Sequence, residues 1–289
     1  MKVTKAIIPA AGFGTRMLPA TKSIPKEMLP LGDKPAIQHI VEEAVSSGIT
    51  DILIITSRTK ISMEDHFDYS PELEAKLKEA GKDELAREMR AIADLANITF
   101  LRQREMLGLG HAVWCGRRFT GSDPFAVLLG DDIMRSETPV TLQLINASEK
   151  YGACSVGVQS VSEEMITKYC SLEVSKLEAN HMLVSDLIEK PRKDQIRSLY
   201  AILGRYVLDQ RVMDLLETLP AGAGGEIQLT DALNAYCKTE RLVAVDFEGK
   251  RYDCGNNQGY LEAAVDFALH DDKTSEFMRK HIKKLAQSL

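Results

Sequence analysis

Short apolar runs alternate along the chain with segments whose apolar residues recur every three or four positions. Four runs have the length and composition of buried strands, and they lie at 6–8, 51–56, 98–101 and 125–129. Between the first two runs, residues 35–48 carry apolar side chains on one helical face, with Pro35 in the first turn and Gly48 at the end. A strand, a helix and a second strand in succession predict a βαβ unit, in which the strands pair in parallel through a right-handed crossover.

The alternation continues through the second half of the chain. It predicts a helix at 138–150, strands at 153–160 and 242–247, a helix that begins near Asn256, and an amphipathic helix at 272–289. We expect an α/β fold with a Rossmann-like mixed, mostly parallel sheet and helices on both faces. Since no repeat, low-complexity tract or linker interrupts the pattern, residues 1–270 are expected to form a single domain. Its two halves would be 1–150 and 151–270, and a helical extension would follow at 271–289.

Residues 59–96 depart from this alternation, because they hold two helical patterns in succession. The second pattern, residues 72–90, is highly charged. Such a helix is either a solvated face or an insertion that packs on another subunit, and the sequence leaves both interpretations open.

The composition excludes several classes of protein. The chain has 289 residues and a formal net charge of −6, which argues against binding to nucleic acid or to an anionic membrane. Its 5 cysteines are widely spaced without a CxxC pair, so we expect free thiols in a reducing compartment. No apolar run approaches membrane-spanning length, and Lys5 and Pro9 interrupt the one at the N-terminus. These features predict a cytoplasmic protein with no membrane partner.

The stretch from Lys5 to Leu31 carries the most specific chemistry. The strand at 6–8 ends in Pro-Ala-Ala-Gly-Phe-Gly-Thr-Arg16, whose small side chains leave backbone N–H groups open to a ligand. Lys26 follows in a segment stiffened by prolines, and two cations beside a bare backbone turn predict a polyphosphate site. The turn matches neither the dinucleotide fingerprint, which needs a third small residue and a helix, nor the Walker loop, which needs Gly-Lys-Ser/Thr.

Two later loops add candidate ligand-binding residues. Asp131 and Asp132 follow a glycine at the end of a wholly apolar strand, where open α/β sheets bind ligands, although aspartate also commonly caps helices. Gln103, with a Gly-x-Gly shortly after it, can offer an amide and bare backbone to a flat polar ring such as uracil. We interpret His111 as a helix-start residue satisfied by local hydrogen bonds rather than as a catalytic group.

The Lys5–Leu31 stretch resembles the N-terminal signature of bacterial UTP–glucose-1-phosphate uridylyltransferases, within the sugar-phosphate nucleotidylyltransferase superfamily. The resemblance rests on Ala-Ala-Gly, on the turn that ends in Gly-Thr-Arg, and on Pro-Lys-Glu-Met-Leu-Pro. Further matches, among them Glu-Lys-Pro at 189–191, extend it almost to residue 270. It implies transfer of UMP from UTP to glucose 1-phosphate, which releases pyrophosphate and gives UDP-glucose. It also implies Mg²⁺ as the cofactor and a homodimer or homotetramer.

The resemblance also implies roles for individual residues. Three cations would act on phosphates, with Arg16 on the β- and γ-phosphates, Lys26 on the α-phosphate and leaving pyrophosphate, and Lys190 on the sugar phosphate. Asp131 and Asp253 would bind the metal. The nucleotide would be bound by Ala10, Ala11, Gly12, Gly14, Thr15, Gln103, Gly108 and Asp132. The sugar would be bound by Cys170, Glu189, Gly204 and Glu226.

Two features of the sugar side leave alternatives open. Glu189 and Lys190 are adjacent in an extended segment, so their side chains face opposite ways unless the strand is distorted. The family usually has Tyr-Gly where this chain has Tyr169-Cys170, and the added side chain narrows the pocket. One alternative for the sugar is therefore another hexose 1-phosphate. Two further alternatives are dTTP in place of UTP and a sugar-nucleotide-binding regulator that has lost turnover.

Overall fold

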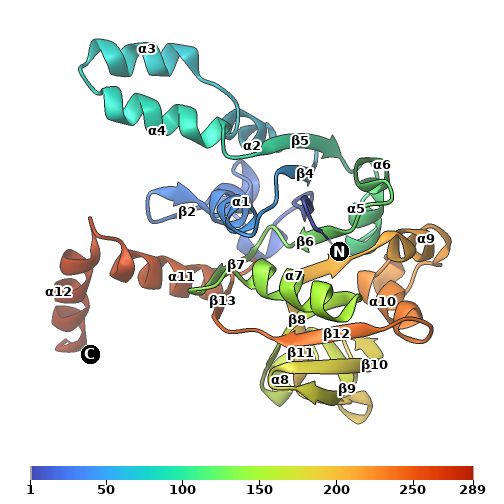
Figure 1. The fold of residues 1–289 in the computed structure, drawn as a ribbon. Coiled ribbons are helices and arrows are strands. Elements are labelled where there is room, and N and C mark those ends of the chain that lie inside the picture. Colours follow the sequence, from blue (N-terminus) through green and yellow to red (C-terminus); the bar gives the residue numbers. More distant parts are fainter. Residues whose placement is uncertain (1, 289) are drawn as a thin grey trace.

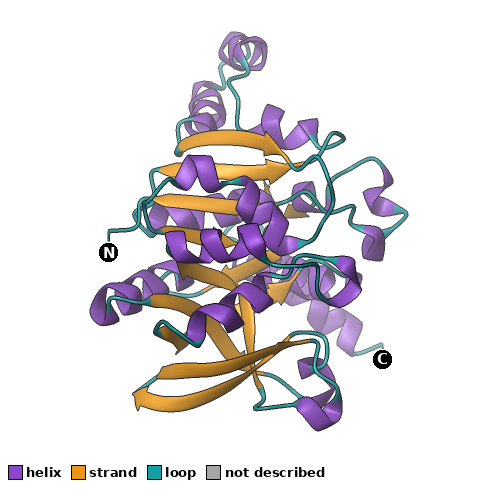
Figure 2. Cartoon of the chain, turned by 90° about the vertical axis from the view of Figure 1, so that its right-hand side faces the viewer, coloured by secondary structure: helices purple, strands orange, loops and turns teal. Residues whose placement is uncertain are grey.

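The computed structural model describes residues 2–288, which are organised around one mixed sheet of nine strands (Figures 1 and 2). In spatial order the strands are β5 (Asn97–Arg102), β4 (Asp51–Thr56), β1 (Lys5–Pro9), β6 (Phe125–Leu128), β11 (Tyr200–Leu208), β8 (Cys154–Ser160), β12 (Leu242–Asp246), β10 (His181–Glu189) and β9 (Cys170–Glu178). The pairs β5–β4, β4–β1, β1–β6 and β8–β12 are parallel, and the other neighbours are antiparallel. The predicted mixed α/β sheet is confirmed, with its parallel part mainly in the first half of the chain.

Helices cover both faces of this sheet, as predicted (Figure 2). They are α1 (Ala36–Ser46), α2 (Ile61–His66), α3 (Pro71–Glu79), α4 (Asp83–Ala93), α5 (Leu109–Cys115), α6 (Arg117–Thr120), α7 (Val140–Tyr151), α8 (Glu163–Ile166), α9 (Gln210–Thr218), α10 (Leu229–Cys237), α11 (Asn257–His270) and α12 (Ser275–Ala286). Two short strand pairs lie outside the main sheet. In one, β2 (Pro30–Leu31) pairs with β3 (Lys34–Pro35), and in the other, β7 (Asp132–Arg135) pairs with β13 (Lys250–Asp253). The predicted βαβ unit is confirmed, because α1 connects β1 to its parallel partner β4.

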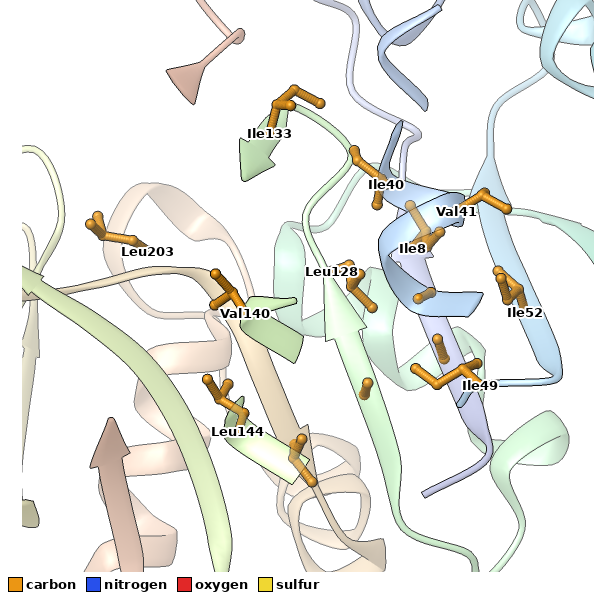
Figure 3. Close-up of a cluster of buried hydrophobic side chains, with 14 of the residues drawn as sticks. Ile8, Ile40, Val41, Ile49, Ile52, Leu128, Ile133, Val140, Leu144 and Leu203 are labelled. Atoms are coloured by element: carbon orange, nitrogen blue, oxygen red, sulfur yellow. The ribbon is translucent and has the colours of Figure 1, made fainter. Parts of the chain in front are cut away.

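Alternate residues of the central strands face two separate hydrophobic cores. In β1, Ile8 belongs to the core beneath α1 and α7, whereas Ile7 belongs to the core beneath α5, α9 and α10. Figure 3 shows the first core, where Ile40 of α1 and Val140 of α7 lie on the same side of the sheet as Leu128 of β6. Burial on both faces is the reason that these strands read as continuous apolar runs in the sequence.

The segment 59–96 differs from its prediction, because it forms three helices rather than two. The charged pattern at 72–90 is divided between α3 and α4. Gly81 has a left-handed backbone (φ 71°) just after α3, a conformation that glycine adopts readily and that ends helices. The two helices form a hairpin that projects from the body of the protein, as α12 does at the C-terminal end (Figure 1). The cations of α12 are exposed, as predicted.

The loops with the predicted site chemistry follow the carboxyl ends of neighbouring parallel strands. Residues 10–16 follow β1, Asp131 follows β6, and Gln103 follows β5. This is the edge at which open α/β sheets bind ligands. Within residues 2–288, no helix combines the length and the apolar composition that crossing a bilayer requires.

Candidate active site

A cavity of about 460 Å³ lies at this edge and extends into the second half of the chain. Its walls come from the loops after β1 and β6 and from β9, β10, β11, β13 and the start of α10. Eight of the predicted site residues line it: Arg16, Asp131, Asp132, Cys170, Glu189, Lys190, Gly204 and Asp253. The structure therefore brings the predicted phosphate, metal and sugar residues to one place, although they are spread over most of the sequence.

The turn after β1 has the open backbone that its small residues predict. Gly14 has a left-handed backbone (φ 65°), and Thr21 Oγ1 donates a hydrogen bond to the Gly14 carbonyl at 2.7 Å. The chain then makes only a short 3-10 turn at Thr15–Met17, so no helix of the dinucleotide-binding type follows. Among the described residues, none accepts a hydrogen bond from the backbone N–H of residues 11–14. These N–H groups are available to an anionic ligand.

The two cations of this loop both lie near Asp131. Lys26 Nζ is 2.5 Å from Asp131 Oδ2, and Arg16 Nη2 is 4.0 Å from the same oxygen. Burial raises the pKa of Asp131, but the Lys26 ammonium outweighs burial and holds that pKa below its usual value. Burial likewise lowers the pKa of Lys26, but the Asp131 carboxylate more than compensates, so the net shift is upward. Both groups are therefore charged at neutral pH, and Arg16 remains largely exposed to an incoming ligand.

A buried ion pair that the sequence analysis missed fixes the backbone segment that carries Lys26. Lys60 Nζ donates to both carboxylate oxygens of Glu27, at 2.7 and 2.8 Å, and to the carbonyl of Ala10 at 2.6 Å. Lys60 thus ties the turn after β1 to the segment that carries Lys26. A buried pair of this kind fixes geometry when its remaining hydrogen bonds are satisfied, as they are here.

The two carboxylates predicted to bind the metal both lie close to Gly255. A Cβ atom placed on Gly255 would lie 2.6 Å from Asp131 Oδ2 and 2.9 Å from Asp253 Oδ1. The backbone holds both residues, because Gly255 N–H donates to Asp253 Oδ1 at 3.0 Å and Cys254 N–H donates to the Asp131 carbonyl at 2.8 Å. Two carboxylates that converge beside phosphate-binding cations match the oxygen ligands that Mg²⁺ takes from proteins, with phosphate and water completing the shell. The described residues contain no group of three or more side chains arranged to hold a metal ion by themselves.

Asp132 points away from its neighbour and into the protein. Arg251 pairs with its Oδ1, at 2.6 Å from Nη2 and 2.7 Å from Nε, and the carboxylate is almost completely buried. Burial raises the pKa of Asp132 to about 6 against the opposing effect of Arg251. Gly204, which has a left-handed backbone (φ 72°), packs directly against this carboxylate, where a Cβ atom would collide with it. Asp132 and Gly204 therefore form the floor of the cavity.

The sugar-side residues Glu189 and Lys190 both line the cavity because the strand is distorted between them. Lys190 has a left-handed backbone (φ 46°), which is uncommon for a residue with a side chain. Its N–H is held by the carbonyl of Tyr169 at 2.8 Å. Glu189 Oε2 accepts a hydrogen bond from Thr230 Oγ1 at 2.8 Å, a contact that the sequence analysis did not anticipate. Cys170 lies beside this pair, and burial raises the pKa of its thiol well above the ordinary value.

Gln103, Gly108 and Glu226 form a separate group next to the cavity. Gln103 Nε2 donates to the Gly108 carbonyl at 3.2 Å and to His111 Nδ1 at 2.9 Å, so the amide is held in one orientation. The interpretation of His111 as a locally satisfied residue at the start of α5 is confirmed. Gly108 (φ 99°) packs so closely on Glu226 that a Cβ atom would lie 2.7 Å from the Glu226 Cβ. Glu226 thus lies with the residues predicted to contact the base, and it is outside the set that lines the cavity with Cys170 and Glu189.

Tyr169 and Arg251 are the main residues of the cavity to which the sequence analysis gave no role. Arg251 could have been found, because residues two apart in a strand share a face and Asp253 was already a candidate. Tyr169 was marked only as the tyrosine of the family's Tyr-Gly pair, and no pattern in the sequence indicated its contacts. Its hydroxyl meets Arg251 and Asp253 only after strands far apart in the sequence come together.

Comparison with known proteins agrees with this geometry. The family described as Nucleotidyl transferase matches residues 5–269. A UTP–glucose-1-phosphate uridylyltransferase of Bacillus subtilis strain 168 is 56% identical over 93% of this chain and 90% of its own length. A UTP-bound UDP-glucose pyrophosphorylase structure from Acinetobacter baumannii superposes with a TM-score of 0.91 at 35% identity, over 98% of this chain and 100% of that one. A UDP-glucose pyrophosphorylase complexed with UDP-glucose gives a TM-score of 0.84 at 40% identity, over 92% and 98% of the two chains. The chain therefore belongs to the Nucleotidyl transferase family, among the UTP–glucose-1-phosphate uridylyltransferases.

Proposed function

We propose that this protein transfers UMP from UTP to glucose 1-phosphate, giving UDP-glucose and pyrophosphate. The observation that carries the proposal is the convergence of Lys26, Arg16 and Asp131 at one point of the cavity that Lys190 and Asp253 also line. The relatives that bear this activity in their names, and the neighbour structures with UTP or UDP-glucose bound, support it.

The reaction needs no nucleophile or general base from the protein. The second pKa of a phosphate monoester is near ~6, so the sugar phosphate is largely a dianion at neutral pH and attacks the α-phosphorus itself. The obstacle is repulsion between this dianion and the triphosphate. Catalysis then depends on alignment and on neutralising charge, which fixed cations at the edge of the sheet can supply.

Each cation has a distinct part in this reaction. Arg16, which is exposed at the mouth of the cavity, binds the β- and γ-phosphates. Lys26, held in place by its buried surroundings, binds the α-phosphate and the leaving pyrophosphate. Lys190, which comes from the second half of the chain and lines the same cavity, holds the phosphate of the sugar. In-line attack requires the incoming and leaving groups to be fixed on opposite sides of the α-phosphorus, which is the reason for assigning one to Lys190 and the other to Lys26.

Asp131 and Asp253 are proposed to hold Mg²⁺, which would neutralise charge on the phosphate oxygens. Nucleotidyl transferases generally use a divalent metal ion. In the absence of ligands Asp131 is paired with Lys26, so metal binding requires the two to share the carboxylate or Lys26 to turn toward the phosphates. Because both carboxylates lie close to Gly255, we expect the cation to bind at this point.

The remaining assignments concern the base, the ribose and the sugar. The turn formed by Ala10, Ala11, Gly12, Gly14 and Thr15 cradles the triphosphate. The open N–H groups of residues 11–14 donate to it, whereas the Ala10 N–H is already bonded to the Ile55 carbonyl. Gln103 presents its fixed amide to uracil beside Gly108. Asp132 supports the site from its floor, where it orients Asp131 or contacts the ribose. The hexose is bound by Cys170, Glu189 and Gly204 of the cavity wall, with Glu189 accepting from sugar hydroxyls. Glu226 would contact the hexose from its place beside Gly108, outside that wall.

Cys170 is expected to be compatible with glucose 1-phosphate, although the family that the sequence resembles usually has glycine at this position. Replacing it with glycine should change kcat/KM for glucose 1-phosphate by less than about tenfold, because its buried thiol packs among neighbours that absorb a small change in volume. Steady-state kinetics with several hexose 1-phosphates checks this. A much larger gain for glucose, together with loss of activity on another hexose 1-phosphate, would show that Cys170 sets a different specificity.

The organisation of the chain follows from these assignments. Residues 1–270 act as a single catalytic unit, with a nucleotide half at about 1–150 and a sugar and metal half at about 151–270. The predicted helical extension at 271–289 corresponds to α12 within the described part of the chain, and residue 289 lies outside that part. The helices α11 and α12 expose four apolar residues, Leu261, Val265, Phe277 and Leu285. These residues support assembly into a homodimer or homotetramer through the two helices. The five free cysteines support a cytoplasmic location.

A pyrophosphate-release assay tests the proposed function. Each nucleoside triphosphate, with dTTP included, is paired with several hexose 1-phosphates in the presence of Mg²⁺. We expect release to be fastest with UTP and glucose 1-phosphate. Binding of UDP-glucose without release of pyrophosphate from any pair would instead indicate a regulator, and faster release with dTTP or another hexose 1-phosphate would change the substrates but not the reaction class.

A further inference from the structure

We infer that Tyr169 is a positioning residue that fixes the side chain of Asp253 and the backbone of Lys190 relative to each other. This inference rests on the proposed function. Tyr169 lies immediately before β9 and is half-buried in the wall of the cavity. Its hydroxyl donates a hydrogen bond to Asp253 Oδ2 at 3.2 Å, and its carbonyl accepts one from Lys190 N–H at 2.8 Å. One residue thus contacts a carboxylate proposed to bind the metal and the cation proposed to bind the sugar phosphate.

Arg251 determines the direction in which the Tyr169 hydroxyl donates. Arg251 Nη1 is 3.0 Å from the hydroxyl oxygen, and the guanidinium lies 4.9 Å from the centre of the Tyr169 ring. A guanidinium can only donate, so the hydroxyl must accept from Arg251, and its single proton is left for Asp253. Arg251 is itself fixed by its ion pair with the buried Asp132. The orientation of Tyr169 is therefore set from the interior of the protein.

The two oxygens of Asp253 are restrained by different partners. Oδ2 accepts from Tyr169, and Oδ1 accepts from Gly255 N–H. In addition, Arg251 Nη2 lies 3.9 Å from Oδ2, which is close enough for electrostatic attraction but too far for a hydrogen bond. The carboxylate can rotate only by breaking one of these bonds, so its orientation beside Asp131 is restrained. Hydrogen bonds to ligating carboxylates typically change metal affinity by about 10- to 100-fold.

The backbone contact restrains Lys190 in a similar way. A left-handed conformation is unfavourable for a residue with a Cβ atom and persists only where the surroundings hold it. The Tyr169 carbonyl provides such support, and it remains in any side-chain variant of Tyr169. A variant that lacks only the hydroxyl therefore isolates the effect on Asp253.

The test compares Tyr169→Phe with Tyr200→Phe, measuring Mn²⁺ affinity by electron paramagnetic resonance with UDP-glucose at saturation. Tyr200 is a matched control, because its hydroxyl also donates to an aspartate, Asp246, at 3.3 Å, and neither residue lines the cavity. We expect Tyr169→Phe to bind Mn²⁺ about tenfold more weakly than the wild type, and Tyr200→Phe to bind it normally. Thermal unfolding without metal should be nearly the same for both variants.

Three outcomes would overturn the inference: wild-type protein that binds no Mn²⁺, Tyr169→Phe affinity within about twofold of the wild type, or an equal loss in Tyr200→Phe. Formation of UDP-glucose by the wild type is measured separately. If the wild type makes UDP-glucose but Tyr169→Phe binds Mn²⁺ normally, only the positioning role fails. If the wild type makes no UDP-glucose, the proposed function fails, and the Mn²⁺ affinities still decide whether Tyr169 positions Asp253.

Discussion

Lys26→Ala should lower kcat by about 10³-fold while changing the KM for UTP much less, because a fixed cation is needed most as pyrophosphate departs. In the structure Lys26 is mostly buried and lies 2.5 Å from Asp131, so the cation is already in place before the substrate arrives. Steady-state kinetics with UTP and glucose 1-phosphate separates the two parameters.

The matched control for this variant is Lys22→Ala. Lys22 is an exposed lysine of the same loop, and no ion pair is seen for it among the described residues. Its replacement should leave kcat nearly unchanged. Because Lys26→Ala also removes the nearest cation from Asp131, thermal unfolding must confirm that the variant is folded. If only the KM for UTP rises, Lys26 binds the ground state and transition state equally, and its proposed role is wrong.

Gly255→Ala should lower turnover by at least about 10²-fold without unfolding the protein, since it disturbs the carboxylates proposed to bind the metal rather than a core. The new methyl group would lie 2.6 Å from Asp131 Oδ2 and 2.9 Å from both Asp253 Oδ1 and Arg16 Nη2. These distances are too short for a real Cβ contact, so one of the three charged groups must move. Gly255 does not have a left-handed backbone, and alanine therefore adds no backbone strain of its own.

The measurement for Gly255→Ala is turnover as a function of Mg²⁺ concentration, with thermal unfolding as the control for folding. We expect the lost turnover to be recovered only in part at high Mg²⁺, because the displaced carboxylates no longer converge on one point. Turnover at the wild-type level, at ordinary Mg²⁺ concentration, would mean that the space beside Gly255 is not where the metal binds.

The local parts of the site could be predicted from the sequence. The turn after β1 is encoded by consecutive small residues, and Asp131 lies directly after an apolar strand, so both positions are fixed by neighbours in the chain. The βαβ unit was equally predictable, because the periodicity of α1 and the apolar runs of β1 and β4 are strong local signals.

The parts that could not be predicted depend on contacts between distant segments. Arg251 pairs with Asp132 across 119 positions, and Tyr169 reaches Asp253 across 84, so no local pattern indicates either contact. The left-handed backbone of Lys190 likewise depends on a distant contact, the hydrogen bond that its N–H donates to the Tyr169 carbonyl. The break between α3 and α4 is different, because Gly81 marked it in the sequence and the charge pattern at 72–90 obscured it.

The most direct test of the account uses glucose 1-phosphate labelled with heavy oxygen in its phosphate group, together with unlabelled UTP and Mg²⁺. Mass spectrometry then locates the label in the products of the wild-type protein. If the sugar phosphate attacks the α-phosphorus directly, all of the label appears in UDP-glucose and the pyrophosphate is unlabelled. Label in pyrophosphate, or the absence of UDP-glucose, would contradict the proposed reaction.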